Sequence, residues 1–193
     1  LWGITKVRGV PLAVYTDRHS VFQPPHRAYE TLEESLSQGR GRTQVGRALR
    51  ELGISQVFAR SPEAKGRVER MAGTFQDRLV SELRLAGATN MADANKVLWK
   101  FLPGFNQRFG VPPVQSGEAY RPVDADLATV LCFKYYCKVA RDNTVKYQWH
   151  TLQLLPSSDR RSYTGVHAEL QIRLDGNMVV LKDGQVIPSR EAP

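Results

Sequence analysis

The sequence has few cysteines and no long apolar run. Two cysteines in 193 residues cannot build a disulfide framework, and no Cys or His pair has the spacing of a zinc site. The longest apolar stretches, such as residues 10–15 and 128–133, are far shorter than the roughly 20 residues that cross a bilayer. The opening residues do not resemble a secretory leader. We therefore expect a protein of a reducing cytoplasm with no membrane partner.

Two common kinds of catalytic site are also absent. The chain has no Gly-rich loop of the nucleotide-binding kind, and Ser20 lacks a suitable His and Asp arrangement. His19 follows Asp17 by two positions, so it either approaches a substrate phosphate or orients a ligand, or is a partly exposed neutral histidine. Cys132 and Cys137 are five positions apart in a strand-like stretch, and we expect structural roles for both.

Positive charge is concentrated in the first part of the chain. The formal net charge is +8, which favours a polyanionic partner. Residues 1–110 hold 17 Lys and Arg against 10 Asp and Glu, whereas residues 111–193 hold 10 against 9. Residues 40–70 alone hold eight bases, and seven of them are Arg, the side chain best suited to bidentate phosphate contact. This basic stretch predicts contact with nucleic acid, with a merely solvated surface as the alternative.

The apolar pattern of residues 1–113 alternates between strands and helices. Residues 12–16 predict a buried strand that ends at Asp17, and residues 23–42 predict a surface insertion. Next come a helix capped by Thr43 and stopped by Gly53, a strand over 54–58, and a helix from Ser61-Pro62 through Leu83. A further helix begins at Asn90 and is expected to be bent or broken near Pro103. The pattern predicts an α/β core.

The pattern changes after residue 113. Residues 114–128 are polar and predict a linker, and residues 129–193 contain short apolar runs. Asp175-Gly176 and Asp183-Gly184 are turn signals between those runs. We expect a small antiparallel β barrel there. Its aromatic residues alternate with Lys and Arg, which suits nucleic-acid contact and the core of a small barrel about equally: Phe133, Tyr135, Tyr136, Tyr147 and Trp149.

Two carboxylates fall where α/β proteins gather their ligands. Asp17 ends the first predicted strand, and Glu69 lies in the first turns of the predicted helix that follows the second. Carboxylate oxygens suit Mg²⁺, and paired metal ions can drive phosphodiester cleavage and transfer. The alternative is that Asp17 begins a turn and Glu69 lies on a solvated helix face.

The sequence segments around both carboxylates resemble those of one protein family. Residues 15–22, Tyr-Thr-Asp-Arg-His-Ser-Val-Phe, resemble the segment that bears the second catalytic Asp of retroviral-integrase-like (DDE) transposases. Residues 61–70 are similar to their Ser-Pro-x-x-x-Gly-x-x-Glu segment. Residues 105–113 and 141–145 resemble a bacterial insertion-sequence group labelled ISNCY. The resemblance spans most of the chain.

The resemblance implies a partial RNase-H-like integrase core over residues 1–113, followed by a barrel over 129–193 that helps to hold DNA or a partner subunit. Asp17 and Glu69 would be the second and third metal ligands, for Mg²⁺ or Mn²⁺, in a bacterial enzyme that cuts and joins duplex DNA as a homo-oligomer. Five basic residues would contact DNA phosphates: Arg40, Arg42, Lys65, Arg67 and Arg70.

One element of the family pattern is missing. The first catalytic Asp of the family lies upstream of the segment that matches Asp17, and residues 1–16 contain no Asp or Glu. Two of three ligands should bind metal weakly, so we expect no strand transfer by this chain alone. The alternative function is a non-catalytic DNA-binding remnant of a decayed transposase. A third is a structural RNA-binding protein, in which Asp17→Asn and Glu69→Gln leave every activity intact.

The basic stretch generates the first testable prediction. Duplex DNA binding by the 193-residue chain should weaken steeply as salt rises from about 50 to 200 mM, because Lys and Arg release counterions from the phosphates. Titration of a labelled duplex at several salt concentrations measures the slope of log K against log salt. A slope near zero would contradict the prediction.

Overall fold

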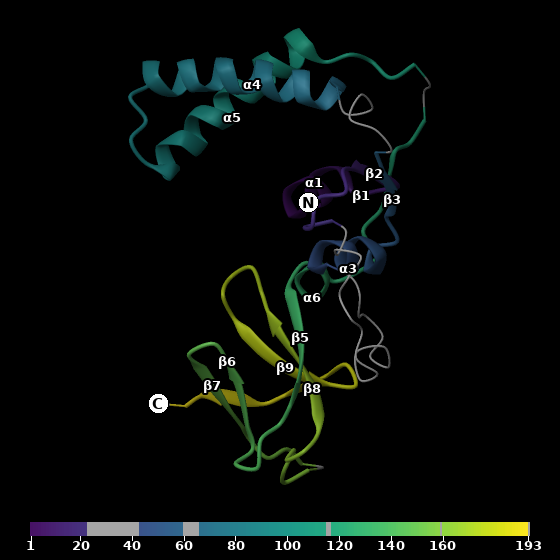
Figure 1. Ribbon diagram of the computed structural model, residues 1–193, viewed down its shortest axis with the longest axis vertical. Helices are drawn as coiled ribbons and strands as arrows, with labels where there is room; N and C mark the ends of the chain where they lie inside the picture. The colour runs from purple at the N-terminus through teal and green to yellow at the C-terminus, as the bar shows by residue number, and fades with distance from the viewer. Residues whose placement is uncertain (23–42, 60–65, 115–116, 159, 193) are drawn as a thin grey trace. The chain divides into compact units, whose positions relative to one another are not determined.

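The computed structural model describes residues 1–22, 43–59, 66–114, 117–158 and 160–192 (Figure 1). Within these ranges the fold is mixed α/β, with several small sheets. No helix there combines the length and apolar character needed to cross a bilayer. The first elements are α1 (Trp2–Arg8), β1 (Val10–Pro11), β2 (Ala13–Thr16), α3 (Gln44–Glu51), β3 (Ser55–Phe58), α4 (Gly66–Leu85) and α5 (Met91–Phe109). After them come β4 (Tyr120–Arg121), α6 (Leu127–Val130), β5 (Phe133–Lys138), β6 (Thr144–Tyr147), β7 (His150–Leu154), β8 (His167–Ile172), β9 (Met178–Lys182), β10 (Gln185–Ile187) and β11 (Ser189–Glu191).

Strands β2 and β3 form a parallel pair. The Ser55 N–H donates to the Leu12 carbonyl at 3.0 Å, and the Ala59 N–H donates to the Thr16 carbonyl at 2.8 Å. Donors and acceptors advance in the same direction, as parallel pairing requires. The strand predicted over 12–16 is found, but its expected burial is wrong. Exposed and half-buried residues alternate along β2, because the sheet has only two strands in the described part of the chain.

Local signals set the limits of α3. The Thr43 hydroxyl accepts a hydrogen bond from the Gly46 N–H at 3.0 Å, which is the expected N-cap. Gly53 follows the helix with φ of +62°, a conformation that favours glycine. The apolar face of α3 packs into a core with Val10 and α6. The predicted helix and the strand after it are both confirmed.

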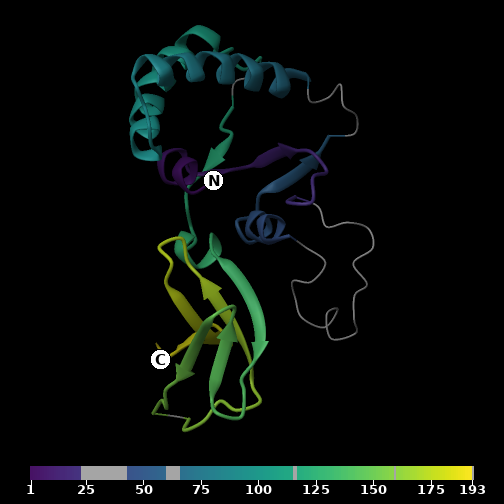
Figure 2. The same cartoon turned by 60° about the vertical axis from the view of Figure 1, so that its left-hand side comes forward.

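Helices α4 and α5 lie side by side (Figure 2). Asn90 caps α5 by accepting from the Asp93 N–H at 2.9 Å, as predicted. Phe75 of α4 meets Phe101 and Phe105 of α5 edge-on, with ring centroids 5.5 and 5.1 Å apart. The helix was expected to be bent or broken near Pro103, and it is not broken there. The helix continues to Phe109, and Phe75 of α4 contacts one ring on each side of the proline, Phe101 and Phe105. The start predicted at Ser61-Pro62 lies outside the described residues.

The C-terminal strands form two antiparallel sheets, a four-stranded one in the order β10-β9-β8-β5 and a three-stranded one in the order β11-β7-β6. The expected closed barrel is therefore wrong. Strand β7 pairs with β6 and β11, so no ladder in the described residues joins the two sheets. Their inner faces share one core that includes Val145, Leu154, Leu170 and Val180.

The two predicted turns of this part are confirmed. Gly176, with φ of +85°, lies in the turn from β8 to β9. Asp183 and Gly184 have φ of +49° and +80° and connect β9 to β10, as a tight hairpin turn requires.

A buried arginine ties α3 to the start of β5. Arg47 is 7% exposed, and its guanidinium donates to Glu51 at 2.9 Å and to the carbonyls of Val130 and Cys132. Lys134 donates from Nζ to the other oxygen of Glu51 at 2.9 Å. Gln44 also donates to the Lys134 carbonyl at 2.7 Å and accepts from its N–H at 3.1 Å. Side chains of α3 thus form hydrogen bonds with backbone groups of the segment that leads into β5.

Compact packing divides the chain into two units. One comprises Leu1–Val14, His19–Gln56 and Tyr120–Pro193, and the other comprises Tyr15–Arg18 and Val57–Ala119. The linker over 114–128 and the boundaries of the predicted domains stay predictions.

The contacts of Arg47 join α3 to the start of β5, and this arginine joint generates the second prediction. Arg47→Ala should lower the free energy of unfolding by about 3 kcal/mol, because it leaves buried carbonyls and part of Glu51 without a donor. Arg50→Ala is the matched control, since Arg50 is exposed on the same helix and should change stability by less than about 0.5 kcal/mol. Chemical denaturation measures both. Equal stability of the two variants would show that the joint contributes nothing.

Candidate carboxylate site

Asp17 lies at the carboxyl end of β2. It follows Thr16 directly and is half-buried. The Thr16 carbonyl accepts from Ala59, the residue that follows β3, so the two parallel strands end at the same edge. Nearby, His19 is held in a local turn: its Nδ1 accepts from the Val21 N–H at 3.3 Å, and its carbonyl accepts from the Phe22 N–H at 2.8 Å. The backbone therefore fixes where Asp17 leaves the sheet.

Glu69 lies in the first turn of α4 and is exposed. The positive end of the helix dipole favours a carboxylate in this turn. Arg70 is exposed beside it, and its guanidinium reaches back over Gly66, where an added Cβ would meet Nη1 at 3.4 Å. That distance is an ordinary contact. The protein's own atoms therefore do not require glycine at position 66.

Asp17 and Glu69 belong to the same compact unit, although they are 52 positions apart. Each is on the type of element that the sequence predicted, one at a strand end and one at a helix start. In the part of the chain that the structure describes, no group of three or more His, Cys, Asp or Glu side chains could hold a metal ion. The donor type suits Mg²⁺, but the number of clustered donors falls short of a complete site.

The predicted DNA-binding residues are only partly described. Arg40, Arg42 and Lys65 lie outside the described residues, as does the side chain of Arg67. Arg70 is exposed near Glu69, as phosphate contact requires. Arg47 also counted toward the basic stretch, but it is buried against Glu51 and backbone carbonyls, so it is not available to DNA.

The two cysteines are free and play no part in the site. Burial raises the pKa of the Cys132 and Cys137 thiols, so both resist ionisation. Their S–H groups donate to the carbonyls of Thr129 and Ala168. These contacts agree with structural roles.

Sequence reasoning missed the partners of Arg47 and the arrangement of the aromatic residues. The carbonyls to which Arg47 donates are 83 and 85 positions away in the sequence, and no residue near Arg47 predicts these contacts. The alternation of aromatic and basic residues after position 132 was the available signal for an aromatic surface. Tyr135 and Tyr147 bring their rings to 4.7 Å, and Trp149 is 82% exposed in the turn between β6 and β7.

Two relatives carry the name transposase. A protein named putative transposase y4bF, of Sinorhizobium fredii (strain NBRC 101917 / NGR234), is 36% identical over 188 residues, which are 96% of this chain and 40% of the relative. The transposase for insertion sequence IS1202 of Streptococcus pneumoniae is 35% identical over 102 residues, 53% of this chain and 21% of the relative. No family model matches the chain.

These similarities support a transposase family. The match to the first relative runs along nearly the whole chain. It therefore includes the compact unit that contains Asp17 and Glu69 as well as the C-terminal sheets. The chain spans less than half the length of either relative.

Proposed function

We propose that this chain is part of a DNA transposase of the retroviral-integrase-like (DDE) type and carries two of its three catalytic carboxylates, Asp17 and Glu69. The observation that carries the proposal is the parallel pairing of β2 with β3. It brings the carboxyl end of the strand before Asp17 to the edge from which the chain leads toward α4 and Glu69. Similarity to two proteins named transposases supports the same reaction class.

The proposed reaction is phosphoryl transfer, in which water or a DNA 3′ hydroxyl attacks a phosphodiester. Mg²⁺ or Mn²⁺, when bound, would supply the charge that activates the attacking oxygen and stabilises the leaving one. Asp17 and Glu69 would be ligands, and a third carboxylate is needed to complete the set. We assign cutting and joining to a whole protein that would supply the third ligand, and not to these two residues alone.

The chain's own contribution is to orient the two carboxylates and to bind DNA beside them. Arg70 is next to Glu69 and exposed at the start of α4, so it can neutralise a phosphate approaching that helix end. Backbone N–H groups in the first turn of a helix also attract anions. DNA phosphate would thus be attracted to the side of the helix that presents Glu69.

A DNA-binding remnant without catalysis is the second candidate. The absence of a three-ligand cluster in the described residues favours it. Both candidates bind duplex DNA, but only the catalytic one requires that Asp17 and Glu69 respond to a divalent metal. The discriminating experiment must therefore compare DNA affinity with and without Mg²⁺.

The proposal predicts that Glu69→Gln raises affinity for duplex DNA about two- to fivefold in EDTA, because it removes a carboxylate that repels the nearby phosphate. Added Mg²⁺ should raise the affinity of the unmodified chain and abolish its difference from the variant. Fluorescence anisotropy of a labelled duplex measures both effects.

Glu82→Gln is the matched control. Glu82 is exposed on the same helix and the substitution removes the same charge, but it lies more than three turns beyond Glu69. It should change affinity less, with no dependence on Mg²⁺. Identical behaviour of the two variants would contradict a carboxylate site at Glu69.

A further inference from the structure

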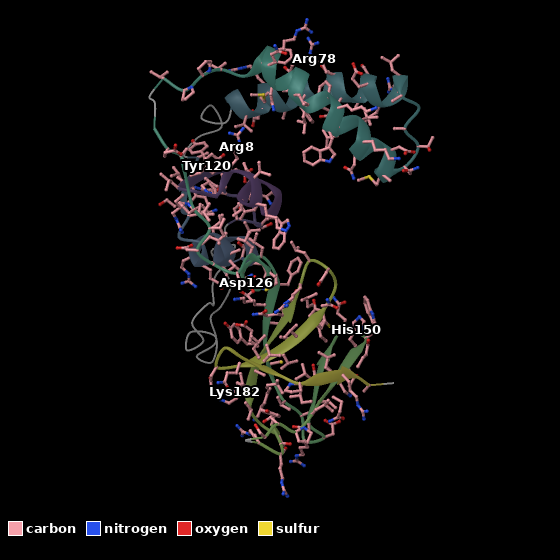
Figure 3. All side chains as sticks on the ribbon, turned by 180° about the vertical axis from the view of Figure 1, so that it is seen from behind. Arg8, Arg78, Tyr120, Asp126, His150 and Lys182 are labelled. Atoms are coloured by element: carbon pink, nitrogen blue, oxygen red, sulfur yellow. The ribbon has the colours of Figure 1, made fainter. Side chains whose placement is uncertain are left out.

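The C-terminal sheets carry an open aromatic cleft at one end. A cavity of about 300 Å³ lies between the start of β5, the turn from β6 to β7 and the turn from β8 to β9. Its lining includes Phe133, Tyr135, Tyr147, Gln148 and His150. His150 lies at the margin of these sheets, away from Lys182 (Figure 3). The residues that line the cleft belong to one compact unit, and Asp17 and Glu69 belong to the other.

The floor of the cleft is a pair of tyrosines. Their rings lie 4.7 Å apart at 40°, and a hydrogen bond to Tyr147, together with burial, raises the pKa of Tyr135 to about 12. Both rings also pack against the core of the two sheets. The floor is thus a fixed aromatic surface, and Tyr135 in it stays neutral at physiological pH.

The rim presents large apolar rings to solvent. Phe133 is 50% exposed at the start of β5, although the next residues on its side of the strand, Tyr135 and Cys137, pack against the core. Trp149 does not itself line the cavity, but it lies in the turn between the lining residues Gln148 and His150, is 82% exposed, and its ring lies 5.6 Å from that of His150. Exposed aromatic rings grouped around a cavity are typical of a binding surface.

The turn that presents Trp149 is strained. Gln148 has φ of +52°, a left-handed conformation that glycine or asparagine adopts far more readily. Its amide donates to the Tyr147 hydroxyl at 3.4 Å, a long and weak contact. A tight turn built for stability alone would favour glycine at this position. Strain of this kind is concentrated at functional sites.

We propose that this cleft stacks one unpaired nucleobase of the DNA. A cavity of about 300 Å³ is at the lower end of the range for ligand sites and suits one ring system better than several side chains of a peptide. Every base offers a ring face for stacking, and stacking on aromatic side chains is tolerant of sequence. This inference rests on the proposed function, because it takes DNA as the partner.

Polar groups around the cleft fit the rest of a nucleotide. The Gln148 amide can exchange hydrogen bonds with the edge of a base. His150 contacts Glu191 through Nδ1 at 2.5 Å, so Nε2 is the ring nitrogen that this contact leaves available. An unpaired base at a DNA end would therefore find stacking and hydrogen bonding in one region.

The test uses the full chain with Trp2→Phe and Trp99→Phe, so that Trp149 is the remaining tryptophan and can be excited selectively. Its probes are a blunt duplex, a duplex with a short single-stranded overhang, and the same overhang without bases, all with equal numbers of phosphates. The overhang should bind about tenfold more tightly than either other probe, which corresponds to one stacked base, and should quench Trp149.

Phe133→Ala should abolish the preference for the overhang and leave blunt-duplex affinity unchanged. Phe133→Tyr should retain the preference, because it keeps a stacking ring. Val186→Ala is the control for a lost exposed apolar side chain, since Val186 is 59% exposed on β10 and does not line the cleft. Circular dichroism of each variant verifies that it folds.

Each outcome separates the cleft from the proposed function. Equal binding of all three probes would overturn the cleft proposal and leave duplex binding intact. Binding of single-stranded oligothymidine with quenching, but no binding of blunt duplex, would support the cleft and contradict the proposed function. Saturable binding of a tryptophan- or proline-containing peptide, without any oligonucleotide binding, would overturn the cleft proposal in favour of a protein partner.

Discussion

Parallel pairing of β2 with β3 is the constraint on which the candidate site depends. An antiparallel pair would send the two strand ends to opposite edges, whereas the bonds from Ser55 to Leu12 and from Ala59 to Thr16 send both to one edge. A parallel pair needs a crossover connection, and α3 forms part of it. The cap at Thr43 and the left-handed Gly53 thus contribute to the position of Asp17, because they fix the limits of that helix.

Local chemistry made much of the fold predictable. The caps at Thr43 and Asn90 and the turn at Asp183-Gly184 follow from side-chain hydrogen bonding and from φ preferences, which neighbouring residues determine. The closed barrel was wrong because barrel closure depends on contacts between distant segments. Of the two alternatives at Pro103, the break was wrong, whereas the bend stays a prediction. The sequence of a single strand does not determine whether β7 pairs with β6 and β11 or closes a barrel.

The candidate site was also predictable only in part from the sequence. The apolar pattern assigned Asp17 to a strand end and Glu69 to the first turns of a helix, and both assignments agree with the structure. Counting charges was less informative, because it treated Arg47 like the exposed Arg50 and Arg70. Arg47 is buried against Glu51 and the carbonyls of Val130 and Cys132, so it stabilises the fold and is not available to bind DNA. That outcome requires tertiary contacts that no charge count contains.

Paramagnetic broadening by Mn²⁺ tests the central claim most directly, because NMR detects even weak metal binding residue by residue. The account predicts that Mn²⁺ broadens amide signals around Asp17 and Glu69 together, and that Asp17→Asn weakens the broadening around Glu69 as well. Broadening at Glu69 that is indifferent to Asp17→Asn, or broadening centred on other residues, would contradict a shared carboxylate site.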